Sequence, residues 1–118
     1  MMVIPTNGKK GLNDAVAKHF GTCQTYTFLD KKGNVKKIID NTSEHMGGAD
    51  LPPDLLKKQG ASILLCEGIG PRALDLCKKL GIRVYVHRTG TVREMFGSWK
   101  AKKARKAGTD DVCKEHQI

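Results

Sequence analysis

Acidic and aromatic residues are scarce in this chain of 118 residues. Against 21 Lys and Arg there are 12 Asp and Glu, a net charge of +9, and the aromatics are one Trp, two Tyr and three Phe. This positive excess favours anionic partners: nucleic acid, acidic protein or a negatively charged small molecule. Much of it lies in Lys100, Lys102, Lys103, Arg105 and Lys106, where only Trp99 adds an aromatic ring. Single-strand binding surfaces interleave aromatics with basic residues, so we interpret this run as a solvated helix end, with nucleic-acid binding as the alternative.

Paired cysteines and long apolar runs are also missing. The four cysteines, at positions 23, 66, 77 and 113, form no Cys-x-x-Cys pair, and a disulfide framework is not expected in a reducing compartment. No apolar run approaches the roughly 20 residues of a membrane helix. The chain opens on an apolar strand instead of a basic leader. We therefore expect a cytoplasmic protein without membrane association, with one domain over residues 1–118 and a flexible tail at 107–118.

The most informative stretch is residues 61–74. Ile63, Leu64 and Leu65 form a short apolar run, which is typical of a strand covered on both faces. Gly68 and Gly70 then allow a tight turn, and Pro71 suits the first position of a helix. With Arg72 in its first turn, such a helix start predicts an anion site. The alternative is a plain strand-to-helix connection.

The hydrophobic pattern predicts an α/β fold of five strands and three helices. Strands are expected at 2–5, 25–29, 35–39, 63–66 and 83–86, and helices at 52–58, 71–80 and 91–105. The order is β-β-β-α-β-α-β-α, and right-handed crossovers then give a five-stranded mixed sheet in the order 3-2-1-4-5. Cys66 and Cys77 fall at apolar positions of a strand and a helix, so we interpret both as core residues.

This topology gathers ligand-type residues at the carboxyl edge of the parallel strands, where open α/β sheets bind ligands. The predicted binding set is Thr6, Asn7, His19, Cys23, His45, Gly68, Gly70, Arg72 and Gly90. Within it, His19, Cys23 and His45 are candidate metal ligands, because imidazole and thiolate suit zinc, iron or an iron–sulfur cluster.

Each candidate ligand also has a structural interpretation. His19 could brace a loop, Cys23 could be a buried edge-strand residue, and His45 could be an exposed residue of a glycine-rich loop, where its functional role would be that of a lid or clamp. Glu67 is the only carboxylate expected near this edge, and no pair of carboxylates is available for two-metal hydrolysis. We therefore expect no enzymatic activity, and an enzyme with Glu67 as its base ranks last among the hypotheses.

Several short motifs, spread over nearly the whole chain, resemble the dinitrogenase iron–molybdenum cofactor biosynthesis family. They are Ile4-Pro5-Thr6, His19-Phe20-Gly21, the glycine-rich loop after Asn41, Gly68-Ile69-Gly70-Pro71-Arg72-Ala73 and Thr89-Gly90-Thr91-Val92. The resemblance implies a ribonuclease-H-like fold. It also implies a protein that binds or carries an iron–sulfur or iron–molybdenum cofactor or its precursor, with His19 as a contact.

The leading hypothesis is therefore a nitrogen-fixation-related carrier of an anionic metal cluster. Its partners would be the proteins that donate and accept the cofactor. The alternative, from a different class, is a nucleic-acid-binding module that uses the basic C-terminal helix.

Overall fold

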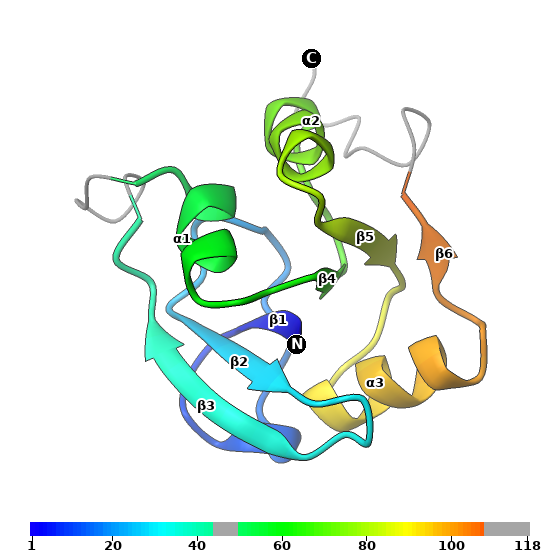
Figure 1. The fold of residues 1–118 in the computed structure, drawn as a ribbon. Helices are drawn as coiled ribbons and strands as arrows, with labels where there is room; N and C mark the ends of the chain where they lie inside the picture. Colours follow the sequence, from blue (N-terminus) through cyan, green and yellow to red (C-terminus); the bar gives the residue numbers. More distant parts are fainter. Residues whose placement is uncertain (44–49, 108–118) are drawn as a thin grey trace.

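The computed structural model describes residues 1–43 and 50–107. It contains a six-stranded mixed sheet in the order β3-β2-β1-β4-β5-β6 (Figure 1). The strands are β1 Met2–Thr6, β2 Thr25–Leu29, β3 Val35–Asp40, β4 Ile63–Cys66, β5 Arg83–Val86 and β6 Arg105–Lys106. The helices are α1 Pro52–Lys58, α2 Pro71–Lys79 and α3 Val92–Lys100, with a short 3₁₀ helix η1 at Gly11–Asn13.

The first five strands have the predicted order. β1 is parallel to β4, and β4 is parallel to β5. β2 runs antiparallel to both β1 and β3. The carboxyl ends of β1, β4 and β5 therefore meet at one edge of the sheet, as the sequence predicted.

The prediction of five strands and of a last helix reaching Arg105 was wrong. α3 ends at Lys100, and the chain then reverses through Lys102, whose φ is +62°. Arg105 and Lys106 pair antiparallel with Val86 and Tyr85 and add the sixth strand. A strand of two exposed basic residues has no alternation of apolar and polar positions, so the sequence cannot distinguish it from the end of a helix.

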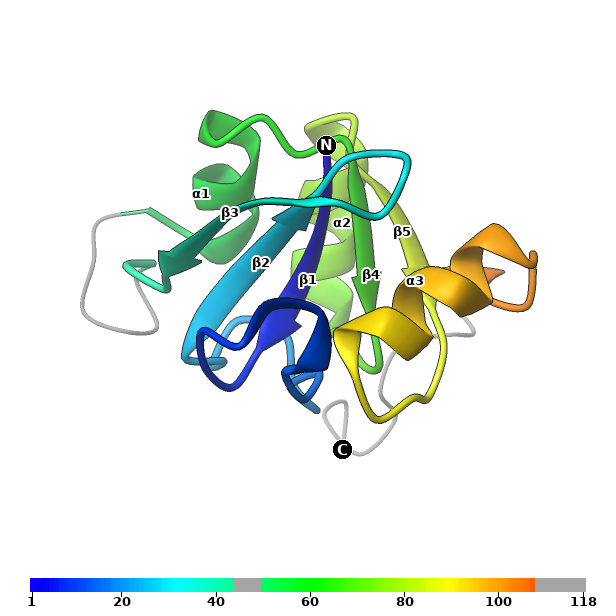
Figure 2. The same cartoon turned by 90° about the horizontal axis from the view of Figure 1, so that it is seen from below.

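Helices cover both faces of the sheet, with α1 and α2 on one side and α3 on the other (Figures 1 and 2). Alternate residues of each central strand pack into two separate cores. Val3 and Leu64 face the core under α1 and α2, whereas Ile4 and Leu65 face the core under α3. β4 is thus buried on both faces, as its continuous apolar run predicted. Cys66 and Cys77 are fully buried in the first core, which confirms their interpretation as core residues.

Two predicted features fall largely or wholly outside the described residues. His45 and its glycine-rich loop lie in 44–49, and 108–118 make up most of the predicted tail. Ala107, where that tail was expected to begin, is buried, and its N–H donates a hydrogen bond to the Val84 carbonyl at 2.7 Å.

In the described part of the chain, no helix has the length and apolar character needed to cross a membrane.

Candidate functional site

A pocket of about 800 Å³, here called the His19 pocket, opens at the carboxyl edge of the sheet. It lies where β1 and β4 end and where the chain leaves β5. Its lining residues are Asn7, Ala15, Val16, Lys18, His19, Glu67, Gly68, Arg88, Thr89 and Gly90. Loops from four separate parts of the sequence therefore form one concave site, at the place where open α/β sheets bind ligands.

The segment that carries Lys18 and His19 is held between strand β1 and the loop that follows β5. The N–H of Ala17 donates to the Pro5 carbonyl at 2.9 Å, and the N–H of Val16 donates to the Gly90 carbonyl at 3.0 Å. Val16 and Ala17 are buried, whereas Lys18 and His19 are exposed. The backbone that positions His19 is thus fixed by hydrogen bonds, while the exposed His19 residue lines the pocket.

Two further hydrogen-bonded contacts fix the loop after His19. The N–H of Phe20 donates to the Gly68 carbonyl at 3.3 Å, which ties this loop to the turn between β4 and α2. The Asn41 side-chain amide donates to the carbonyls of Gly21 and Cys23, both at 2.9 Å. Asn41 is buried at the end of β3, so a single side chain ties this loop to the third strand.

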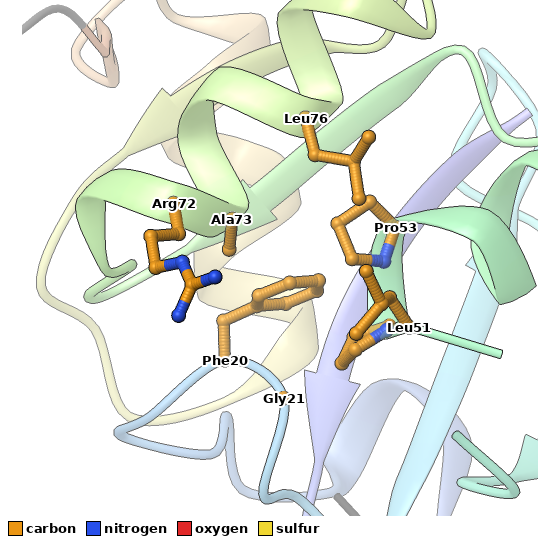
Figure 3. A pocket seen from close by; sticks show the side chains of 8 residues that line it. Phe20, Gly21, Leu51, Pro53, Arg72, Ala73 and Leu76 are labelled. Atoms are coloured by element: carbon orange, nitrogen blue, oxygen red, sulfur yellow. The ribbon is translucent and has the colours of Figure 1, made fainter. Parts of the chain in front are cut away.

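A second pocket, of about 570 Å³, lies on the other side of this loop and is here called the Phe20 pocket. Figure 3 shows the Phe20 ring between the Arg72 guanidinium and the side chains of Leu51 and Pro53, beneath Ala73. It lies between the first turns of α1 and α2, and most of its lining is apolar. This pocket was not predicted from the sequence. The available signals were an apolar residue, Leu51, ahead of two prolines and the pair Ala73 and Leu76 at helical spacing.

The charges around the His19 pocket are mixed, with a cationic excess. Lys18 and Arg88 line it together with one carboxylate, that of Glu67. The hydroxyl of Thr89 is buried and has no hydrogen-bond partner among the described residues. A ligand with acceptor atoms would satisfy that hydroxyl and gain from the two cations.

The starts of α2 and α3 differ in how they are capped. Thr91 and Glu94 form a complete capping box at α3, with the Thr91 N–H donating to the Glu94 carboxylate at 3.0 Å. At α2, no side chain of the described residues caps the helix, and its first turn has no acidic residue. The positive end of the α2 dipole is therefore left to solvent or to a ligand beside Arg72.

The predicted binding residues are divided by this geometry. Asn7, His19, Gly68 and Gly90 line the His19 pocket together. Arg72 lines the Phe20 pocket instead, and the N-cap Gly70 has open space where a Cβ would stand. The sequence predicted one site, and the structure divides its residues between two pockets on either side of the loop at residues 19–21.

Thr6 and Cys23 are buried beneath this edge and line neither pocket. The Thr6 hydroxyl lies 2.7 Å from that of Thr25 and 3.0 Å from that of Thr27, so it joins β1 to β2. The Cys23 side chain belongs to the core under α1 and α2, and burial raises the pKa of its thiol above the usual 9.0. A buried neutral thiol is a poor metal ligand until it is exposed and deprotonated.

Few side chains at this edge of the sheet are therefore available to bind a metal ion directly. Among residues 1–43 and 50–107, no three His, Cys, Asp or Glu side chains are placed to hold a metal ion together. The His19 pocket offers one imidazole, one carboxylate, two cations and backbone polar groups. Such a site can hold an anion by charge and attach it through a single ligand.

The family model described as "Dinitrogenase iron-molybdenum cofactor" matches residues 1–102. The chain belongs to this family. An uncharacterised protein of Methanocaldococcus jannaschii is 30% identical to it over 87 residues, which cover 70% of this chain and 74% of that protein.

Two solved structures share the fold of this family member. The apo form of the orange protein from Desulfovibrio gigas has a TM-score of 0.78 at 22% identity, covering 91% of this chain and 92% of that one. A NifB-like protein from Thermotoga has a TM-score of 0.72 at 23% identity, covering 89% and 90%. These TM-scores show a shared fold, and the family match relates the chain to the iron–molybdenum cofactor family.

Proposed function

We propose that this protein binds and carries a preassembled, anionic iron–sulfur or iron–molybdenum cluster in the His19 pocket. The observation that carries the proposal is the grouping of one imidazole, His19, with two cations, Lys18 and Arg88, around a single pocket in a chain of this family. Metal–sulfur clusters are commonly anionic, and imidazole nitrogen is a suitable ligand for their iron.

The small number of possible metal ligands in the His19 pocket favours transient binding of a preassembled cluster over permanent binding of a single metal ion. A bare ion needs about four protein ligands, as in structural zinc sites, whereas a preassembled cluster brings its own sulfide ligands. His19 would supply one protein bond, and Lys18 and Arg88 would balance the cluster's charge. A single protein ligand also suits release, since a carrier must pass its cargo to another protein.

The family resemblance supports the remaining parts of the proposal. It supports a ribonuclease-H-like classification of the fold and a role as carrier instead of enzyme. The partners would be one protein that donates the cluster and another that accepts it. The orange protein of the same fold has been solved in an apo form, which fits a protein that alternates between empty and loaded states. Cys23 is left out of the proposed ligand set because its thiol is buried.

The test is anaerobic reconstitution with iron and sulfide, followed by gel filtration, metal analysis and visible absorption spectra. The wild-type protein should retain a coloured cluster, and His19→Ala should lose most of it. His87→Ala is the matched control, because His87 leaves β5 at the same edge but lines neither the His19 pocket nor the Phe20 pocket. A colourless wild-type protein, or equal loss in both variants, would contradict the proposal.

A further inference from the structure

A third pocket, here called the Trp99 pocket, lies at the far end of α3 from the His19 pocket. It has a volume of about 450 Å³ and is lined by Tyr85, Trp99, Lys100, Lys102 and Ala104. Tyr85 comes from β5 and Trp99 from the last turn of α3, and both are partly exposed. Two aromatic side chains far apart in sequence are thus brought to one hollow beside lysines.

The charge around this pocket has one sign. Every charged residue between 99 and 107 is basic, and Lys103 and Lys106 are exposed beside the two lysines of the lining. Within the described ranges none of these four lysines forms an ion pair, whereas Lys58 and Lys79 each pair with an aspartate. Lys100 instead lies 6.0 Å from the centre of the Phe96 ring. The surface therefore has cations available for an anionic ligand.

Lys102 occupies a backbone position that glycine usually fills. Its N–H donates to the Trp99 carbonyl at 3.0 Å, and the N–H of Lys103 donates to the Ser98 carbonyl at 2.8 Å. These two bonds form the Schellman ending of a helix, in which the residue at Lys102 takes a left-handed conformation. Strained non-glycine residues are concentrated at functional sites. This left-handed turn brings Lys102 into the lining of the Trp99 pocket.

We propose that the Trp99 pocket binds single-stranded nucleic acid. One base would stack on Trp99 and Tyr85, and the flanking phosphates would contact Lys100, Lys102 and Lys103. Aromatic platforms within a basic surface are the means by which proteins bind single strands without sequence preference. An acidic protein surface would also be attracted by the lysines, but its charged groups do not stack on aromatic rings, whereas every nucleotide joins a phosphate to a base that does. This inference does not depend on the proposed carrier function.

Trp99 makes the proposal directly measurable, because it is the only tryptophan in the chain. A thymidine oligonucleotide of about 12 nucleotides should quench its fluorescence, with an affinity that falls steeply as salt rises. Heparin, a polyanion without bases, should bind more weakly and leave the emission nearly unchanged. Poly-glutamate serves as the acidic-protein probe and should bind more weakly still.

Two variants separate stacking from charge, with binding followed by the anisotropy of a labelled oligonucleotide. Tyr85→Leu should weaken oligonucleotide binding at least about fivefold and leave heparin binding unchanged. Lys102→Gly keeps the left-handed turn but removes the charge, and it should lower the salt slope by roughly 1. Lys57→Gln, at an exposed position of α1 on the other face of the sheet, is the charge-matched control and should have no effect.

Three outcomes would overturn the inference. One is an oligonucleotide that binds without quenching Trp99. Another is heparin or poly-glutamate binding as tightly as the oligonucleotide, which would indicate a general polyanion surface or an acidic protein partner. The third is equal loss of binding in Lys57→Gln and Lys102→Gly. Circular dichroism of each variant verifies that the fold is retained.

Discussion

The backbone N–H of Phe20 donates a hydrogen bond to the carbonyl oxygen of Gly68 at 3.3 Å. This contact fixes the loop between β1 and β2 on the turn that leads into α2. As a result, two adjacent side chains face different pockets: His19 lines one and Phe20 the other. A shift of this loop would alter both pockets at once.

The first prediction concerns the amide that holds this loop from the other side. Asn41→Ala removes three hydrogen bonds: the two that the amide donates to the Gly21 and Cys23 carbonyls, and the one that its Oδ1 accepts from the Ser43 N–H at 3.0 Å. All three partner residues are buried, so we expect the free energy of unfolding to fall by about 2–3 kcal/mol. Urea denaturation followed by circular dichroism measures this change.

The neighbouring Thr42 provides the control for that experiment. It is exposed, so Thr42→Ala should change the free energy of unfolding by less than about 0.5 kcal/mol. A loss of under about 1 kcal/mol for Asn41→Ala would mean that water replaces the amide, and that the loop does not depend on it.

The position of the site could be predicted from the sequence because chain direction determines it. Parallel β1, β4 and β5 end at one edge, so Asn7, Gly68 and Gly90 had to approach one another once the strand order was known. His19 followed because it precedes β2, which begins at that same edge. None of these placements depends on detailed side-chain packing.

The division into two pockets could not be predicted in the same way. It depends on the hydrogen bond between the backbone groups of Phe20 and Gly68. Because nearly every residue has the same backbone N–H and C=O groups, the sequence does not indicate which of them will pair. The burial of Thr6 and Cys23 could not be predicted from the sequence either, because hydroxyl and thiol side chains occur both in ligand sites and in packed cores. The Trp99 pocket was missed because Tyr85 reaches Trp99 only through the packing of α3 on the sheet.

The second prediction concerns stability at alkaline pH. Burial raises the pKa of the Cys77 thiol to about 12 from its usual 9.0. The folded protein keeps this thiol neutral, while the unfolded chain ionises it at its usual pKa. Its contribution to stability is therefore complete below pH 9.0 and is lost as the pH rises toward about 12.

Urea midpoints measured between about pH 8 and pH 11 test this expectation. The wild-type midpoint should fall across this range. Cys77→Ala should start lower, because it leaves a small cavity in the core, and should then fall less steeply. Parallel curves for the two proteins would show that ionisation of other groups controls alkaline unfolding.

The third prediction uses the mixed charges of the His19 pocket. Glu67 and Arg88 line the same pocket with opposite charges, so neutralising each should change cluster retention in opposite directions. Glu67→Gln removes a repulsion and should slow the loss of a reconstituted iron–sulfur cluster by roughly 3–10-fold. Arg88→Gln removes an attraction and should speed that loss by a similar factor. Cluster absorbance after dilution into a chelator gives both rates.

Asp75→Asn is the control, because Asp75 is exposed on α2 and pairs with Lys79 at 3.1 Å, outside the pocket. It should leave the rate of cluster loss unchanged. The same set also separates a carrier from an enzyme that uses Glu67 as its base. In an enzyme, Glu67→Gln would abolish turnover, whereas a carrier would gain affinity from the same change. Faster cluster loss in Glu67→Gln would instead make Glu67 a ligand of the cargo, and the charge argument for this pocket would fail.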